Sequence, residues 1–198
     1  MIRRGEAWGH ATVMPDKVND VDSDASLGSS DASEPVFVSH GDIARSIGNP
    51  SRPPSGSDCT EISIDAMKCT ILKTEVGDIV VNAASSIVVG SFWKGRNVIV
   101  SNAGWLKNSN VAPRAHPNDG VVEVLNLSSS MSLRQRALAR RKMLTGTHLP
   151  HPEISMSRES SFRIDRTKNE KLMIDGIRIP NWSEISIEVV PDYWRVLL

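Results

Sequence analysis

A basic stretch, residues 132–144 (SLRQRALARRKML), holds the densest set of groups that could bind a ligand. It carries five cations and no acidic residue, namely Arg134, Arg136, Arg140, Arg141 and Lys142. Arginine forks match phosphate oxygens in a bidentate geometry. The stretch therefore predicts binding of lipid headgroups or of a phosphorylated ligand, and a solvated helix face is the plainer alternative.

Two histidines, His148 and His151, follow in a proline-containing turn at residues 146–152 (GTHLPHP). In an extended, polyproline-like chain, their three-residue spacing separates them by roughly 9 Å along the axis. A shared metal ion, with His116 as a third ligand, would need the backbone to bend. The two side chains are predicted to contact a ligand, or to belong to a turn that returns the chain to a sheet.

The long segment 102–120 (NAGWLKNSNVAPRAHPNDG) is a third candidate, since long ordered loops are often functional. Arg114 and His116 supply a cation and a titratable group. Asp119 and neighbouring carbonyl groups could bind Mg²⁺, a hard cation that prefers oxygen ligands. An ordinary Asp-Gly turn into the next strand is the alternative.

Short β-patterned pieces must position these segments. They combine β-branched residues with alternation, as half-buried strands do, at residues 36–38, 60–70, 78–90, 91–101, 121–127, 172–174, 177–179, 184–190 and 194–198. Residues 132–144 predict a capped helix that docks on a sheet through Leu133, Ala137 and Leu144. Residues 42–47 predict a shorter helix. The fold class expected is mainly β: a sandwich-like domain of short antiparallel strands with one prominent basic helix.

The overall composition limits the function classes. Lys and Arg number 23 and so do Asp and Glu, so no global charge attracts nucleic acid, and we expect no nucleic-acid partner. Residues 14–35 carry six acids against one lysine and predict a flexible acidic insertion in a single domain spanning residues 1–198. No apolar run approaches membrane-spanning length, and Cys59 and Cys69 lack metal or redox spacing. We expect a cytoplasmic protein, with peripheral membrane association as an alternative.

The order of the elements in the second half resembles the C-terminal region of the bacterial diacylglycerol kinase and lipid kinase family, related in fold to NAD kinases. The matching pieces are Asn102-Ala103-Gly104, Ala112-Pro113, Asp119-Gly120, Asp175-Gly176 and residues 188–192 (EVVPD). The resemblance covers residues 80–198. It implies an enzyme with an ATP-binding α/β domain, which carries a Gly-Gly-Asp-Gly-Thr loop, and a β-sandwich that supplies the lipid acceptor side.

This chain departs from that pattern. It has no Gly-Gly pair, so no phosphate loop of this type is present, and ATP is expected only with a partner. The family's Asp-Gly-Glu pattern implies a catalytic role for Asp175, but Ile177 replaces the glutamate. His116 replaces the first acid of an Asp-x-x-Asp-Gly magnesium turn, which leaves Asp119 as the remaining candidate ligand.

Three functions are open from the sequence. The first is a non-catalytic lipid-kinase-like domain that binds a lipid or anionic membrane surface, a phosphorylated ligand or a partner protein, with no cofactor held by this chain alone. The second is a subunit that completes a kinase in trans with a separate ATP-binding protein. The third is a homodimeric β-sandwich scaffold.

Overall fold

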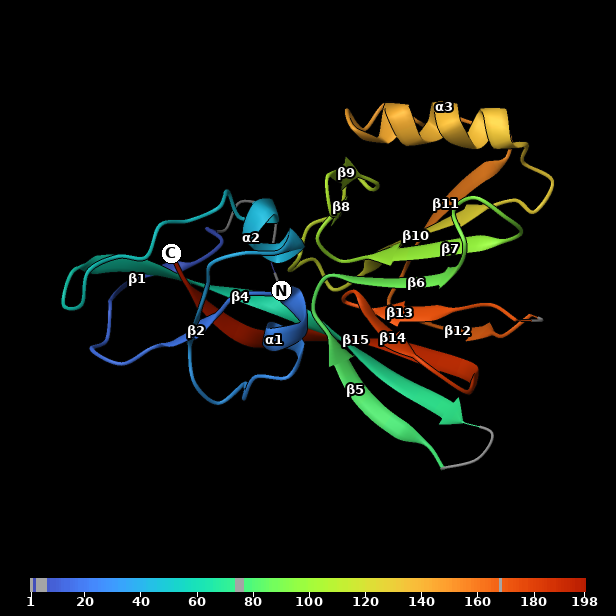
Figure 1. Cartoon of the computed structure of the whole chain (residues 1–198). Coiled ribbons are helices and arrows are strands. Elements are labelled where there is room, and N and C mark those ends of the chain that lie inside the picture. Colours follow the sequence, from blue (N-terminus) through green and yellow to red (C-terminus); the bar gives the residue numbers. More distant parts are fainter. Residues whose placement is uncertain (1, 3–6, 74–76, 168) are drawn as a thin grey trace.

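The computed structural model describes residue 2 and residues 7–73, 77–167 and 169–198. Two long strands organise it, β4 (Asp58–Lys73) and β15 (Trp182–Leu197), which pair antiparallel along nearly their whole length (Figure 1). At one end of this pair, β5 (Ile79–Ala83) and β12 (Ser161–Asp165) extend the sheet. At the other end, β1 (His10–Val13), β3 (Val36–Val38) and β2 (Asn19–Val21) extend it. The pair therefore runs through both halves of the molecule.

A second sheet packs against the β5–β12 end and forms a sandwich. Its strands, in spatial order, are β11 (Ile154–Glu159), β10 (Val122–Leu127), β7 (Asn97–Ser101), β6 (Ser86–Gly90), β13 (Leu172–Ile174) and β14 (Ile177–Ile179). The core between the sheets contains Met67, Ile71, Val89, Val100 and Ile187, all buried. Burial of these β-branched and long apolar side chains is the main stabilising term. The predicted β-sandwich is confirmed.

The other half has an α/β character. Strands β2 and β3 run parallel to each other, β3 runs parallel to β15, and helices α1 (Asp24–Gly28) and α2 (Asp42–Ser46) follow the two short strands. The predicted short helix near residues 42–47 is thus present. Residues 14–35, expected as a loop, contain β2 and α1. The physical reason is that Val21 and Leu27 are buried in a core with Ile43 and Trp194. Burial of these two apolar residues orders the segment although its composition is acidic.

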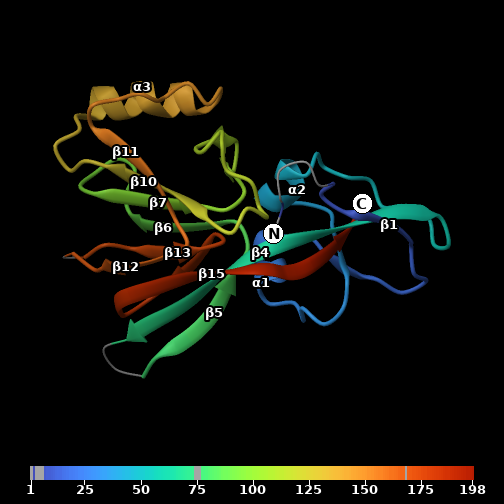
Figure 2. The same ribbon diagram turned by 180° about the vertical axis from the view of Figure 1, so that it is seen from behind.

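Helix α3 (Leu133–Met143) confirms the predicted basic helix, and Ser132 caps it with a capping box to Gln135. The predicted docking face is wrong. Arg136, Ala139 and Met143 are buried, whereas Leu133 and Leu144 are 66% and 54% exposed. Both views place α3 along the outside of the sandwich, apart from α1 and α2 (Figures 1 and 2). None of the helices in the described ranges is long and apolar enough to cross a membrane.

Three predicted strand segments have different boundaries. Residues 78–90 break at Ala84 and Ser85 into β5 and β6, which belong to different sheets. The two segments predicted at 184–190 and 194–198 form one strand, β15, with a register shift between Val190 and Trp194. The segment 102–120 contains a small hairpin of β8 (Trp105–Leu106) and β9 (Ser109–Asn110).

Candidate functional site

A cavity of about 290 Å³ lies where the sandwich meets α1 and α2. Three carboxyl groups from distant segments line it, those of Asp24, Asp42 and Asp175. The other lining residues come from α2, the β5–β6 and β13–β14 turns and the β8–β9 hairpin: Gly41, Arg45, Ser85, Ser86, Leu106, Lys107, Asn108 and Gly176. We call this site the acidic cavity.

Asp24, the first residue of α1, fixes the start of α2. Its Oδ2 accepts the N–H of Asp42 at 2.8 Å, and its Oδ1 accepts that of Ile43 at 3.0 Å. Gly41 has a φ of 111°, and a Cβ there would lie 2.5 Å from Asp24 Oδ1. Only glycine permits this backbone and this close approach. The Asp24 carboxylate therefore positions Asp42 on the cavity wall.

Asp175 lies in the β13–β14 turn with a φ of 46° and binds the break between β5 and β6. Its Oδ2 accepts the Ala84 N–H at 2.7 Å, and its Oδ1 accepts the N–H groups of Ser85 and Ser86, each at 2.9 Å. The Ser85 hydroxyl also donates to Oδ1 at 2.9 Å. Burial raises the pKa of Asp175, and the three N–H donors oppose that shift. This carboxyl group holds the two sheets together at the cavity.

Asp42 is the carboxyl group with the fewest partners among the three. Its Oδ2 accepts the N–H of Lys107 at 2.9 Å, and the residue is 9% exposed. Burial raises the pKa of Asp42 from 3.8 to about 6; the Lys107 N–H lowers it and the nearby Asp24 carboxylate raises it. Arg45, on the same helix, donates to the Lys107 carbonyl at 2.9 Å and lies over the Trp105 ring at 5.1 Å. Asp42 is therefore a proton acceptor near neutral pH at the cavity surface.

The raised pKa of Asp42 predicts a pH-dependent stability. The folded state holds the proton more tightly than the unfolded chain, so Asp42 stabilises the fold fully below about pH 4 and loses that contribution as the pH rises through 6. We expect Asp42→Asn to be more stable than the wild type at pH 7 by ~2 kcal/mol. Urea unfolding of both proteins at pH 4.5 and 7 measures this. An equal pH dependence in the two proteins would show that Asp42 titrates normally.

The predicted arginine site is divided by the structure. Arg136 is 1% exposed, and its guanidinium donates to four backbone carbonyls, those of Met131, Phe92, Gly95 and Ser128. These bonds explain why a charged residue faces the sheet in place of Leu133. Arg140 is half-buried, 5.7 Å from the Phe92 ring centre, while Arg134 and Arg141 are exposed on the outer face of α3. The exposed Arg134, Arg141 and Lys142 remain on α3 to meet a surface anion.

The predicted cation site at Asp119 does not fit a metal ion. Asp119 is ion-paired to Arg158, and His116 packs edge-on against Trp8 with its Nδ1 accepting the Asn118 N–H at 3.2 Å. The amide nitrogen of Asn118 donates to Asp65 Oδ1 at 3.1 Å and to Asp192 Oδ1 at 2.8 Å. The Asn118 amide group thus bridges the carboxylates of Asp65 and Asp192, where it takes the place that a cation between two carboxylates would need. Within the described ranges, no cluster of three or more acidic, histidine or cysteine side chains could hold a metal.

The remaining predicted residues are separated. Arg114 and His151 line one cavity beside the 146–152 turn, about 500 Å³ in volume. His148 is buried at 2% exposure and burial lowers its pKa. Arg114 and His116 do not line the acidic cavity with Asp175. Of the three carboxyl groups in the acidic cavity, one, that of Asp175, was predicted from the sequence. Asp42 could have been found from the glycine that precedes an acidic residue at the start of the predicted short helix.

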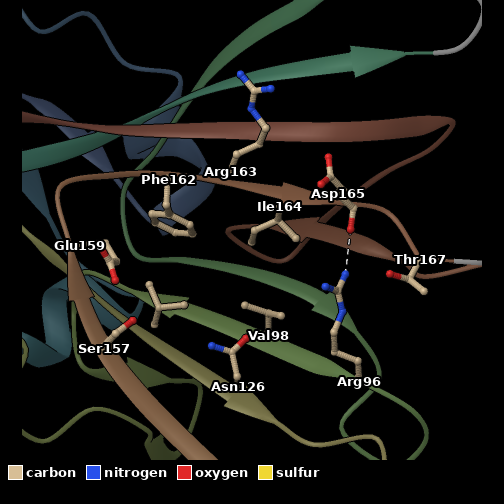
Figure 3. A pocket seen from close by; sticks show the side chains of 11 residues that line it. Arg96, Val98, Asn126, Ser157, Glu159, Phe162, Arg163, Ile164, Asp165 and Thr167 are labelled. Atoms are coloured by element: carbon tan, nitrogen blue, oxygen red, sulfur yellow. Dashed lines mark hydrogen bonds between the residues drawn. The ribbon is translucent and has the colours of Figure 1, made fainter.

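A third cavity, of about 530 Å³, opens at one end of the sandwich (Figure 3). Val98, Val124, Phe162 and Ile164 form its apolar part. Arg96 and Arg163 also line it, and the Arg163 side chain points away from the apolar group in Figure 3. Arg96 donates to Glu170 and to the Asp165 carbonyl, and Arg163 pairs with Glu184 at 3.1 Å. Because both guanidinium groups are already paired, this opening offers weaker anion binding than its composition suggests.

The two-sheet sandwich and its α/β layer form a β-sandwich domain of the NAD kinase-like type. The sequence model of the "YegS C-terminal NAD kinase beta sandwich-like domain" matches residues 77–198, and the chain belongs to this family. This confirms the resemblance stated from the sequence. A comparison with curated proteins finds no significant match.

Two solved structures from Bacillus anthracis str. Sterne, both assigned as diacylglycerol kinases, share the fold. The first has a TM-score of 0.53 at 10% identity, covering 88% of this chain and 75% of the other. The second has a TM-score of 0.51 at 11% identity, covering 82% and 69%. An 88% coverage exceeds the span of the family match, so the shared fold extends into residues before 77 and includes part of the α/β half.

Proposed function

We propose that this chain is a lipid-kinase-type domain that binds the hydroxyl-bearing headgroup of a neutral lipid in the acidic cavity. The observation that carries the proposal is the convergence of Asp24, Asp42 and Asp175 on one cavity of about 290 Å³. Carboxylates accept hydrogen bonds from hydroxyl groups and repel phosphate. In the lining the three carboxylates outnumber the two cations, Arg45 and Lys107, so the cavity favours an unphosphorylated alcohol. The two structural neighbours assigned as diacylglycerol kinases support a diacylglycerol-like ligand.

Phosphoryl transfer by this chain alone is not part of the proposal. That reaction depends on groups that hold the phosphates of ATP and neutralise their charge. The sequence has no Gly-Gly pair to form the family's phosphate loop. Ile177 stands where the family pattern implies a glutamate, and it is 56% exposed. In this proposal the acidic cavity binds the lipid that would accept a phosphoryl group, and the chain does not provide the loop that would hold ATP as the phosphoryl donor.

A second candidate function is the acceptor half of a kinase whose ATP-binding half is a separate protein. The pKa of about 6 at Asp42 favours it, because a carboxylate that titrates near neutral pH is suited to take the proton of an attacking hydroxyl group. In that case phosphorylated lipid forms only when a protein carrying a Gly-Gly-Asp-Gly-Thr loop is added. Asp42→Asn would then abolish the activity of the mixture.

The outer face of α3 supports access to lipid from an anionic membrane. Leu133, Leu138 and Leu144 are between 52% and 66% exposed, and Arg134 and Arg141 lie between them. Exposed leucines can enter the headgroup region of a bilayer while arginines contact lipid phosphates. The proposal therefore includes peripheral contact with a membrane through this face.

Calorimetric titration with 1,2-dioctanoylglycerol tests the proposed function. We expect binding to the wild type and at least tenfold weaker binding to Asp42→Asn, because the amide presents a donor where the hydroxyl group needs an acceptor. Asp165→Asn, an exposed carboxyl group at the far end of the sandwich, is the matched control and should bind normally. Tighter binding of dioctanoyl phosphatidate than of the alcohol would contradict the proposal, as would formation of phosphorylated lipid from ATP and Mg²⁺ by the chain alone.

A further inference from the structure

The cavity beside the 146–152 turn shares no lining residue with the acidic cavity. It is about 500 Å³ in volume and is lined by Pro113 and Arg114 of the 102–120 segment, by the turn that follows α3 and by β11. Its lining residues are Pro113, Arg114, Gly146, Leu149, Pro150, His151, Ile154 and Met156. We call it the apolar cavity.

The wall of the apolar cavity suits an alkyl chain. Five of its eight lining residues are apolar, and none is acidic. The volume lies within the range of small-molecule sites, and such sites combine apolar walls with a few placed polar groups. Binding of an unbranched alkyl chain would remove the apolar surface of the cavity and the apolar surface of the chain from water.

Two cationic or donor groups lie at the same cavity. Arg114 is exposed. Burial raises the pKa of the nearby Glu123, the charges of Arg158 and Arg114 oppose that shift, and Glu123 is ion-paired to Arg158 at 3.1 Å. His151 Nδ1 accepts the N–H of Glu153 at 3.0 Å. In the neutral ring, the proton is therefore on Nε2, which is left to donate. A guanidinium and an imidazole N–H together match a carboxylate or a phosphate head.

The cavity has a fixed shape because its two loops are in close contact. Gly146 has a φ of 68°, and a Cβ at this position would lie 2.8 Å from Pro113 Cγ. The glycine thus lets the turn approach the 102–120 segment and sets Arg114 and His151 on one opening. Leu149 and Ile154 also belong to the core beneath α3, so the apolar wall continues into the folded interior.

We propose that the apolar cavity binds an anionic single-chain amphiphile, with its chain against Leu149, Ile154 and Met156 and its head on Arg114 and His151. The ligand class is a fatty carboxylate or an alkyl phosphate. This site is independent of the acidic cavity and of the neutral lipid proposed for it.

Amide chemical shifts of the ¹⁵N-labelled full chain test the proposal with decanoate and decyl phosphate, each below its micelle concentration. We expect saturable shifts at Gly146, His151, Ile154 and Met156, and at least tenfold weaker binding in Arg114→Ala. Arg178→Ala, an exposed arginine on β14 at the opposite edge of this sheet from β11, is the matched control and should bind as the wild type does. Decanol has the chain without the charge and should bind at least tenfold more weakly than decanoate.

Equal affinities for decanol and decanoate would overturn the assigned head site, and an absence of shifts at these amides would overturn the cavity as a site. Competition separates the two sources of the ligand. Displacement of decanoate by phosphatidylcholine vesicles that contain a tenth of lysophosphatidate, but not by phosphatidylcholine alone, would place the amphiphile in a membrane. Persistence of decanoate binding in both cases would identify a free fatty acid as the ligand.

Discussion

Replacing Arg136 with leucine is expected to lower the free energy of unfolding by about 3–4 kcal/mol. The side chain is 1% exposed, and its guanidinium joins four carbonyls from two segments, Met131 and Ser128 before α3 and Phe92 and Gly95 in the β6–β7 loop. Leucine fills similar space but leaves four buried carbonyls without their donor. Hydrogen bonds to a charged group contribute more than neutral ones, and unpaired buried acceptors are costly.

Urea denaturation of Arg136→Leu and of Arg134→Leu measures this effect. Arg134 is the second residue of the same helix but is exposed, so its substitution should change stability by no more than about 0.5 kcal/mol. A loss below 1 kcal/mol in Arg136→Leu would mean that the four carbonyls find other partners and that the arginine does not hold α3 on the sandwich.

Substitution of Asp175 by asparagine is expected to cost about 2–3 kcal/mol at pH 7. The carboxylate receives three backbone N–H groups and one hydroxyl group, with both oxygens in use. Asparagine would place an NH₂ group against the Ala84 N–H or against the donors of Ser85 and Ser86. Burial raises the pKa of Asp175, so the buried charge itself is destabilising. An amide, however, cannot offer two acceptor oxygens. We expect the lost hydrogen bonds to outweigh the relief of the charge, so that the substitution lowers the free energy of unfolding.

The same substitution in the same cavity therefore has opposite expected effects at two positions. Asp42 accepts one N–H, that of Lys107, which an amide oxygen can still serve, and Asp42→Asn gains stability. Parallel thermal melts of the two variants test this contrast. A stabilised Asp175→Asn would show that desolvation outweighs the hydrogen bonds. A loss of function in Asp175→Asn must be compared with its stability before it is attributed to chemistry.

The strand pattern and the basic helix could be predicted from the sequence because they depend on local periodicity and capping. The docking face of α3 could not. An apolar stripe at Leu133, Ala137 and Leu144 is more hydrophobic than the face with Arg136, but the guanidinium finds four carbonyls that only the folded β6–β7 loop and the 128–131 turn provide. The break between β5 and β6 depends likewise on Asp175, some ninety residues away in the sequence.

The candidate site was predicted in part. Asp175 was identified through the resemblance to the lipid kinase family, and the family itself is confirmed. Asp24 was hidden in an acidic stretch whose composition is typical of disorder, and its role depends on Gly41, seventeen residues further on. Arg114 and His151 meet in one cavity because the turn after α3 packs against the 102–120 segment, a tertiary contact without a sequence period. Ligand binding by any of these residues stays a prediction.

Chemical-shift mapping of dioctanoylglycerol on the ¹⁵N-labelled chain would show whether the acidic cavity binds a hydroxyl-bearing lipid, since it locates the lipid as well as detecting it. We expect saturable shifts at the amides around the acidic cavity, those of Asp42, Ser86, Lys107 and Gly176, and their loss in Asp42→Asn. Shifts confined to the apolar cavity, or unchanged binding in Asp42→Asn, would contradict the claim that the three carboxyl groups form the site of a hydroxyl-bearing lipid.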